Sequence, residues 1–195
     1  MTTGGYAPRL RAAAGFVPLM FALLLAGCAG GLSSLPPLPE SETGAYSLGA
    51  GDRLRLQVFG QEELSQEYLV SDSGVITMPL IGSVEAEGQT LATLEQDIAQ
   101  RLSDGILVDP NVTAEIVAYR PFFILGETRA PGQYPYVPRM TVLTAVSMSG
   151  GFTFRAERDE VSITRLVDGQ MAEFRADPLD FVEPGDVINV HERFF

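Results

Sequence analysis

Apolar and polar residues alternate along much of the chain after residue 45, with the period of two that is typical of half-buried β-strands. The alternation is clearest over residues 54–58 and 112–118. The apolar run 122–125 predicts a buried strand. Further short strands are predicted at 67–71, 75–78, 80–84, 133–136, 160–167, 171–174 and 187–191. The pattern therefore predicts a chain built mainly of short strands.

Two segments replace this alternation with the spacing of a helix. Thr90 is a suitable N-cap for the first helix, and Gly105 can close it. Thr141 can cap the second, which ends at Gly150 and Gly151. The inner faces are predicted to carry Leu91, Leu94, Ile98 and Leu102 in the first helix and Val142, Leu143 and Val146 in the second. A helix laid on each small mixed sheet predicts an α+β fold of two small β-rich domains.

Turn residues separate these elements. Gly51-Asp52 and Gly185-Asp186 each stand directly before a strand. We interpret both pairs as turns in which the aspartate bonds to nearby backbone amides, rather than as metal or catalytic sites. Pro79 interrupts an apolar segment and predicts an edge strand or a bulge there. The other predicted structural turn positions are Gly74, Gly82, Gly126, Pro131, Gly132, Gly150 and Gly151.

The first 45 residues differ from the rest of the chain. Arg9 and Arg11 precede an uncharged run over residues 12–26 that ends in small residues, which is typical of a secretory signal peptide. A membrane-spanning helix would need about 20 apolar residues. Residues 28–45 are rich in Gly, Ser and Pro and predict a flexible tether. Folded structure is therefore expected from about Tyr46 onwards.

The charge balance excludes some classes of partner. The 195 residues carry a formal net charge of −12, and removal of the leader would also remove Arg9 and Arg11. So acidic a chain is a poor candidate for binding nucleic acid or anionic lipid. The charge indicates solubility, or else a surface that repels a passing acidic polymer. The single cysteine excludes an internal disulfide.

The sequence offers little to support catalysis, and we predict no catalytic residue and no metal site. His191 is the only histidine, and no serine stands in a G-x-S-x-G elbow. The glycine-rich stretches lack the phosphate-binding pattern. Counting residues leaves a Ser-His-Asp set open, and paired carboxylates could in principle cleave glycosides. However, Asp52, Asp72 and Asp186 all stand at predicted turns, where a structural role is commoner.

The end of the leader carries a recognisable motif. Leu25-Ala26-Gly27-Cys28 resembles the lipobox of bacterial lipoproteins. The resemblance implies cleavage between Gly27 and Cys28 and acylation of Cys28, with palmitate for example, so that the covalent lipid would be the only added group. Ala29, rather than aspartate, implies an outer-membrane protein that faces the periplasm. The alternative is an ordinary signal peptide with a chance cysteine.

Four segments together resemble one family. They are residues 46–60, 74–90, 126–151 and 184–195, and they begin with the sequences YSLGAGD, GVITMPLIG, GETRAPGQY and PGDVI. In this order behind a lipobox, they resemble the outer-membrane polysaccharide export lipoproteins of the Wza type. The resemblance implies a leader at 1–27, a polysaccharide export domain at 46–119 and a β-grasp domain of the SLBB (soluble-ligand-binding) type at 120–195.

The resemblance also implies a function. The family forms homo-oligomeric rings that export capsular or extracellular polysaccharide without catalysis, together with an inner-membrane chain-length regulator or copolymerase. Longer members carry a C-terminal helix that crosses the outer membrane, and this sequence has no comparable apolar stretch after Cys28. We therefore expect a short form that relies on a separate outer-membrane barrel protein.

A second interpretation stays open at this point. The chain could be a monomeric periplasmic lipoprotein that binds a soluble ligand or envelope polymer through its β-grasp domain. Tyr134, Tyr136, Phe152 and Phe154 are the aromatic candidates for stacking on a sugar, although core or interface packing is the commoner use of such residues. A closed ring would favour the conduit, and a monomer the binding module.

Overall fold

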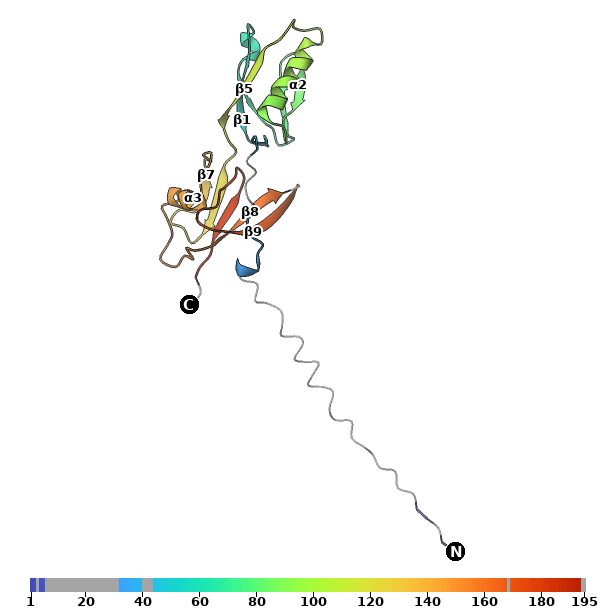
Figure 1. The fold of residues 1–195 in the computed structure, drawn as a ribbon, viewed down its shortest axis with the longest axis vertical. Helices are drawn as coiled ribbons and strands as arrows, with labels where there is room; N and C mark the ends of the chain where they lie inside the picture. Colours follow the sequence, from blue (N-terminus) through green and yellow to red (C-terminus); the bar gives the residue numbers. More distant parts are fainter. Residues whose placement is uncertain (3, 6–31, 40–43, 168, 194–195) are drawn as a thin grey trace. The chain divides into compact units, whose positions relative to one another are not determined.

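The computed structural model describes residues 1–2, 4–5, 32–39, 44–167 and 169–193 (Figure 1). Gly27 and Cys28 lie outside the described residues, so cleavage and acylation remain predictions. Residues 1–31 and 32–195 are separate units, and every helix and strand named below belongs to the second. That unit contains two hydrophobic cores, one in each half.

The first half is built on a small antiparallel sheet with a helix against it. The sheet has the order β2-β1-β5, and a two-stranded hairpin of β3 and β4 completes the half. The elements are β1 (Arg53–Val58), the 3-10 helix η3 (Glu62–Leu64), β2 (Glu67–Leu69), β3 (Val75–Met78), β4 (Gly82–Glu85), α2 (Leu91–Ser103) and β5 (Val112–Ala118). Leu54, Leu56 and Val58 on β1 are buried together with Leu94 and Ile98 on α2.

The local sequence explains why α2 begins where it does. The hydroxyl oxygen of Thr90 accepts the backbone N–H of Thr93 at 3.2 Å, which satisfies one of the free amides at the helix start. Leu94, Ile98 and Leu102 are fully buried, and Leu91 packs at the margin of the same core. The predicted cap and the predicted inner face are therefore both present.

The second half is a five-stranded mixed sheet with one short helix. Its order is β7-β6-β10-β8-β9, in which β6 and β10 are parallel and the other pairs antiparallel. The elements are β6 (Phe122–Gly126), β7 (Gly132–Tyr134), α3 (Val142–Met148), β8 (Val161–Val167), β9 (Gln170–Ala176) and β10 (Val187–Val190). A further 3-10 helix, η2, covers Leu32–Ser34 before the first half. Phe122, Ile124, Ile163 and Ile188 form the core with Val142 and Val146.

The fold class is α+β, as the sequence predicts, with one α-helix in each half of the described chain. Residues 36–38 of the predicted flexible tether are folded against β9, because the N–H of Leu38 donates to the carbonyl of Arg175 at 2.7 Å and the N–H of Arg175 donates to the carbonyl of Pro36 at 2.8 Å. Three further details differ from the prediction. Pro79 lies in the turn between β3 and β4, which are both edge strands of their two-stranded sheet, so it marks no bulge. Leu80 in that turn has φ 70°, and β4 begins only at Gly82. Leu143 is 44% exposed, and Ala145 takes the inner position beside Val142 and Val146.

The third difference concerns β6. The apolar run 122–125 predicts a buried strand, but Phe123 and Leu125 are exposed while Phe122 and Ile124 are fully buried. The helix covers only one face of this sheet, so alternate side chains of β6 point to the uncovered face. A short apolar run does not by itself distinguish burial on one face from burial on both.

Candidate functional site: the paired Gly-Asp turns and the adjoining cleft

The two Gly-Asp pairs form turns of the same geometry. Gly51 and Gly185 have φ values of 93° and 91°, a left-handed conformation that favours glycine. In the first turn the Oδ2 atom of Asp52 accepts the backbone N–H of Gly49 at 2.9 Å. In the second, Oδ2 of Asp186 accepts the backbone N–H of Glu183 at 2.7 Å. Both aspartates are buried, and each carboxylate stabilises its own turn by accepting a backbone N–H group.

The second aspartate also holds a buried arginine. The Nε and Nη2 atoms of Arg165 on β8 donate to the two carboxylate oxygens of Asp186 at 2.9 and 2.7 Å. Arg165 donates further to the carboxylate of Glu183 and to the carbonyl of Phe181. Burial raises the pKa of Asp186, and the hydrogen bond from Arg165 opposes that rise without cancelling it.

A second arginine joins the two turns. The backbone N–H of Arg120 donates to Oδ1 of Asp52 at 2.7 Å, and its Nε donates to the carbonyl oxygen of Pro184 at 3.0 Å. Its Nη1 donates to the hydroxyl of Tyr46 at 2.8 Å and lies 3.4 Å from the Asp52 carboxylate. A Cβ atom on Gly49 would come within 2.2 Å of that Nη1, so a larger residue there would displace the Arg120 guanidinium. Arg120 therefore ties the first half of the chain to the last turn of the second.

A cleft of about 640 Å³ adjoins this arginine. Tyr119 lies between Tyr46 and Tyr136, with ring centroids 5.1 and 5.3 Å apart and nearly perpendicular ring planes. The guanidinium of Arg139 lies over the ring of Phe181 at 6.0 Å. Edge-to-face rings with phenolic hydroxyls form a wall that is partly apolar and partly polar. Such a wall can bind the apolar face of a sugar as well as its hydroxyl groups.

The aromatic residues singled out in the sequence separate in the structure. Tyr136 lines the cleft. Tyr134 and Phe152 pack against the core of the second half, and Tyr134 contacts Phe122 with ring centroids 6.1 Å apart. Phe154 lines a different pocket. The sequence did not indicate Tyr46 and Tyr119 as cleft residues. Tyr46 precedes the first Gly-Asp turn and Tyr119 directly follows β5, and the fold places their rings in contact.

The remaining predicted turn positions do not form a site with the paired turns. Gly74 lies in the turn before β3, and Gly126 lies at the end of β6. Pro79 and Gly82 flank the β3–β4 turn, Pro131 and Gly132 lead into β7, and Gly150 and Gly151 follow α3. Among the predicted turn positions, only the two Gly-Asp turns are brought together, and Arg120 is the residue that bonds to both, while Arg165 bonds to Asp186 within the second turn.

The environment of His191 is structural in character. Its Nε2 atom lies 2.8 Å from the hydroxyl of Ser162, whose residue is only 1% exposed and therefore out of reach of a polymer. The other side chain near that nitrogen is the amide of Asn189, at 3.4 Å. Within the described residues, the side-chain partners of His191 are Ser162 and Asn189, and no group of three or more His, Cys, Asp or Glu side chains is placed to hold a metal ion.

Comparison with known proteins identifies the class. Residues 40–117 match the family described as "Polysaccharide biosynthesis/export protein", and residues 121–175 match the SLBB domain. The chain therefore carries a polysaccharide biosynthesis/export domain followed by an SLBB domain, as the four sequence segments indicate. It is 34% identical over 140 residues to "Exopolysaccharide production protein ExoF" of Rhizobium meliloti (strain 1021). That alignment covers 66% of this chain and 32% of ExoF, so the chain matches about a third of the length of its relative.

The part of the chain that the structure describes holds no helix that is both long enough and apolar enough to cross a membrane.

The pH dependence of stability tests the contacts that Tyr46 makes with Asp52 and Arg120 between the two halves. Burial raises the pKa of its phenol, so the folded protein keeps this proton at a pH where the unfolded chain loses it. The stabilisation is therefore complete below pH 10, the ordinary tyrosine pKa, and is lost as pH rises above it. The free energy of unfolding should fall between pH 9 and pH 11 in both proteins. We expect this fall to be about 1.4 kcal/mol smaller in Tyr46→Phe than in the wild type. Urea unfolding at both pH values measures this, and equal losses in the two proteins would contradict it.

Proposed function

We propose that this protein is a non-catalytic component of the machinery that exports an extracellular polysaccharide. The observation that carries the proposal is the match of two consecutive segments to a polysaccharide export domain and an SLBB domain. The similarity to a protein named for exopolysaccharide production supports the same role. The fold suits a structural part, because Arg120 fixes a turn of one half to a turn of the other.

The location and assembly follow as parts of this proposal. The lipobox supports an acylated Cys28 that anchors the chain in the outer membrane, facing the periplasm. A lipoprotein with more than one acyl chain stays stably in the bilayer. Copies of the folded part would form a homo-oligomeric ring through head-to-tail contacts that close. An inner-membrane chain-length regulator or copolymerase and an outer-membrane barrel protein are the proposed partners, and capsular or extracellular polysaccharide is the proposed cargo.

Secretion by a deletion strain tests the role. We expect the strain to lose extracellular polysaccharide and the wild-type gene to restore it, measured as total carbohydrate in the culture supernatant. Cys28→Ala removes the acylation site and should fail to restore export, whereas Ser33→Ala in the tether should restore it as the wild type does. Immunoblots ensure that the variants are compared at equal amounts. Unchanged secretion in the deletion strain would overturn the proposal.

The cleft beside Arg120 supports a second candidate function. Its volume of about 640 Å³ and its three tyrosines suit a small ligand, as a monomeric periplasmic binding lipoprotein would require. Sedimentation of the purified protein in detergent separates the two candidates. A closed oligomer supports the conduit component, and a monomer that binds a soluble ligand or envelope polymer supports the binding module.

A further inference from the structure

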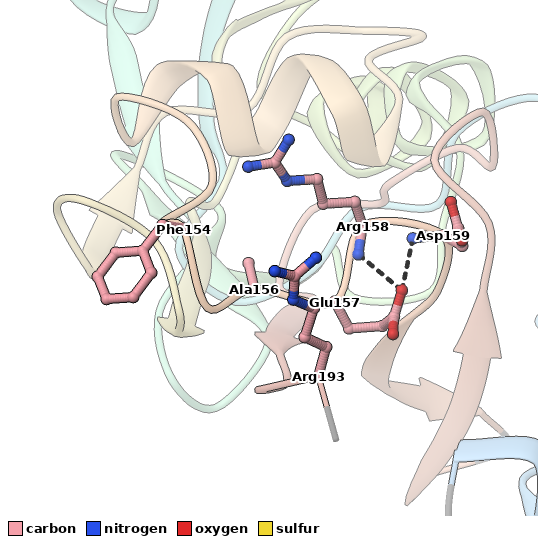
Figure 2. Close-up of a pocket in the computed structure, with 6 residues that line it drawn as sticks. All are labelled: Phe154, Ala156, Glu157, Arg158, Asp159 and Arg193. Carbon is pink, nitrogen blue, oxygen red and sulfur yellow. Dashed lines mark hydrogen bonds between the residues drawn. The ribbon is translucent and has the colours of Figure 1, made fainter. Parts of the chain in front are cut away.

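A second pocket lies in the SLBB half, formed by the segment between α3 and β8 and by the chain that follows β10 (Figure 2). Its volume is about 440 Å³, within the range of sites for small molecules. Six residues line it: Phe154, Ala156, Glu157, Arg158, Asp159 and Arg193. This pocket shares no residue with the tyrosine cleft. Neither the family matches nor the relative assigns it a role.

The charged groups of the pocket are arranged unevenly. Figure 2 shows the guanidinium groups of Arg158 and Arg193 on the side of the Phe154 ring, and the carboxylates of Glu157 and Asp159 on the other side. Glu157 is already engaged, because its Oε1 atom accepts the backbone N–H groups of Arg158 and Asp159 at 2.8 and 3.1 Å. The pocket is lined by two arginines and two carboxylates, and the guanidinium groups are the charges on the side of the aromatic ring.

Arg158 is available for a ligand. It is exposed and forms no ion pair with any other residue in the described ranges, and its Nη2 atom reaches only the carbonyl oxygen of Thr153, at 3.5 Å. The nearby Arg155, in contrast, is paired with Glu192. The Phe154 side chain is 81% exposed, which leaves a large apolar surface in water next to a cation. An exposed aromatic ring beside an uncompensated guanidinium is a combination that a ligand can use.

The walls of the pocket are held in place by backbone contacts. The N–H of Thr153 donates to the carbonyl of Glu127 at 3.0 Å, and the N–H of Glu157 donates to the carbonyl of His191 at 2.8 Å. The N–H of Arg193 donates to the carbonyl of Arg155 at 2.9 Å, which ties the chain after β10 to the loop. A ligand would therefore meet a surface already in position, which reduces the entropy cost of binding.

We propose that this pocket binds a sugar unit that carries a carboxylate. Phe154 would lie against the apolar face of the sugar ring, and the planar guanidinium of Arg158 would pair with the carboxylate. The proposal rests on the proposed export function, because a passing polymer supplies the ligand. A net charge of −12 repels an acidic polymer over most of the surface, so an exposed guanidinium without an ion pair would determine where such a polymer contacts the chain.

Titration calorimetry of the purified full chain in neutral detergent tests the proposal. The probes are trigalacturonic acid and its fully methyl-esterified form, which has the same ring and linkage but no charge. We expect the acid to bind about fivefold more tightly at low salt, the size of one exposed ion pair. The preference should disappear in 0.5 M NaCl, because salt screens exposed charges.

Two variants and a control locate the binding. Arg158→Gln should abolish the preference for the acid, and Phe154→Ala should weaken the binding of both forms. Arg53→Gln removes the same charge from an exposed position on β1 and should leave both affinities unchanged. The proposal is overturned if acid and ester bind equally, if neither binds, or if Arg158→Gln keeps the preference. The deletion strain tests export independently, so failure of the pocket would leave the export role standing.

Discussion

Asp186→Ala should lower the free energy of unfolding by about 3–5 kcal/mol. The substitution leaves the guanidinium of Arg165, whose side chain is 6% exposed, without its buried carboxylate partner and with only the partly exposed Glu183. A buried cation without a partner keeps its desolvation cost and loses the attraction that offset it. The backbone N–H of Glu183 loses its acceptor at the same time. The exposed carboxylate of Glu183 stays near Arg165 but cannot replace the two hydrogen bonds that Asp186 accepts.

The pKa of Asp186 adds a second expectation to this test. Because burial raises it above its ordinary value despite Arg165, the ionised carboxylate is less favourable in the folded protein than in water. The stabilisation from this group is therefore complete below the ordinary aspartate pKa and is lost as pH rises through the raised value. Removing one partner of such a buried ion pair lowers the free energy of unfolding strongly, whereas the intact pair adds little to it compared with an apolar pair. Arg165→Met combined with Asp186→Leu should therefore recover most of the loss.

Urea unfolding followed by circular dichroism measures these differences, since the chain has no tryptophan for fluorescence. Glu192→Ala is the matched control, because it breaks an ion pair whose side chains are both about half exposed and should cost 1 kcal/mol or less, at about the level of surface pairs generally. A loss below about 1 kcal/mol in Asp186→Ala would show that Arg165 finds another partner, and the assigned role of the pair would then be wrong.

The Arg165–Asp186 pair illustrates what the sequence could and could not predict. Alternation locates β8 and places Arg165 on the same face as Val161 and Ile163, so a charge on a buried face was visible as a signal. The Gly-Asp motif identified the turn that holds Asp186. The pairing of the two was not predictable, because periodicity tells which face a residue occupies and not which distant residue it meets.

The same limit applies to the contacts of Arg120 between the two halves and to the five-stranded sheet. Arg120 stands before a proline and marks a boundary in the sequence, yet in the structure it bonds to Asp52 and Pro184, which lie 68 and 64 residues away. The strands themselves were predicted closely, since β1 and β5 follow strict alternation. The parallel pairing of β6 with β10 joins segments that are far apart in the sequence, and no local pattern reports such a contact.

Gly126→Ala tests that parallel pairing and should cost about 3 kcal/mol of unfolding free energy, the sum of left-handed backbone strain and an overpacked contact. Gly126 has φ 82°, and a Cβ atom there would lie 2.1 Å from the carbonyl oxygen of Val190 on the paired strand. That neighbour is backbone in the middle of the sheet, so it cannot rotate away as a side chain could. Either β6 and β10 must separate locally, or the residue must leave its left-handed conformation.

Two other glycines separate the cost of the left-handed backbone from the cost of the close contact. Gly82→Ala has φ 71° with no atom within 4 Å of the new Cβ, so it should show the strain alone, about 1–2 kcal/mol. Gly132→Ala has neither a positive φ nor a close neighbour and should be nearly neutral or slightly stabilising, since alanine reduces the freedom of the unfolded chain. Urea unfolding of the three variants should therefore rank the losses Gly126, Gly82, Gly132. Equal losses at Gly126 and Gly82 would mean that the close approach of β6 to Val190 does not constrain this position, and that glycine is needed there only for its backbone conformation.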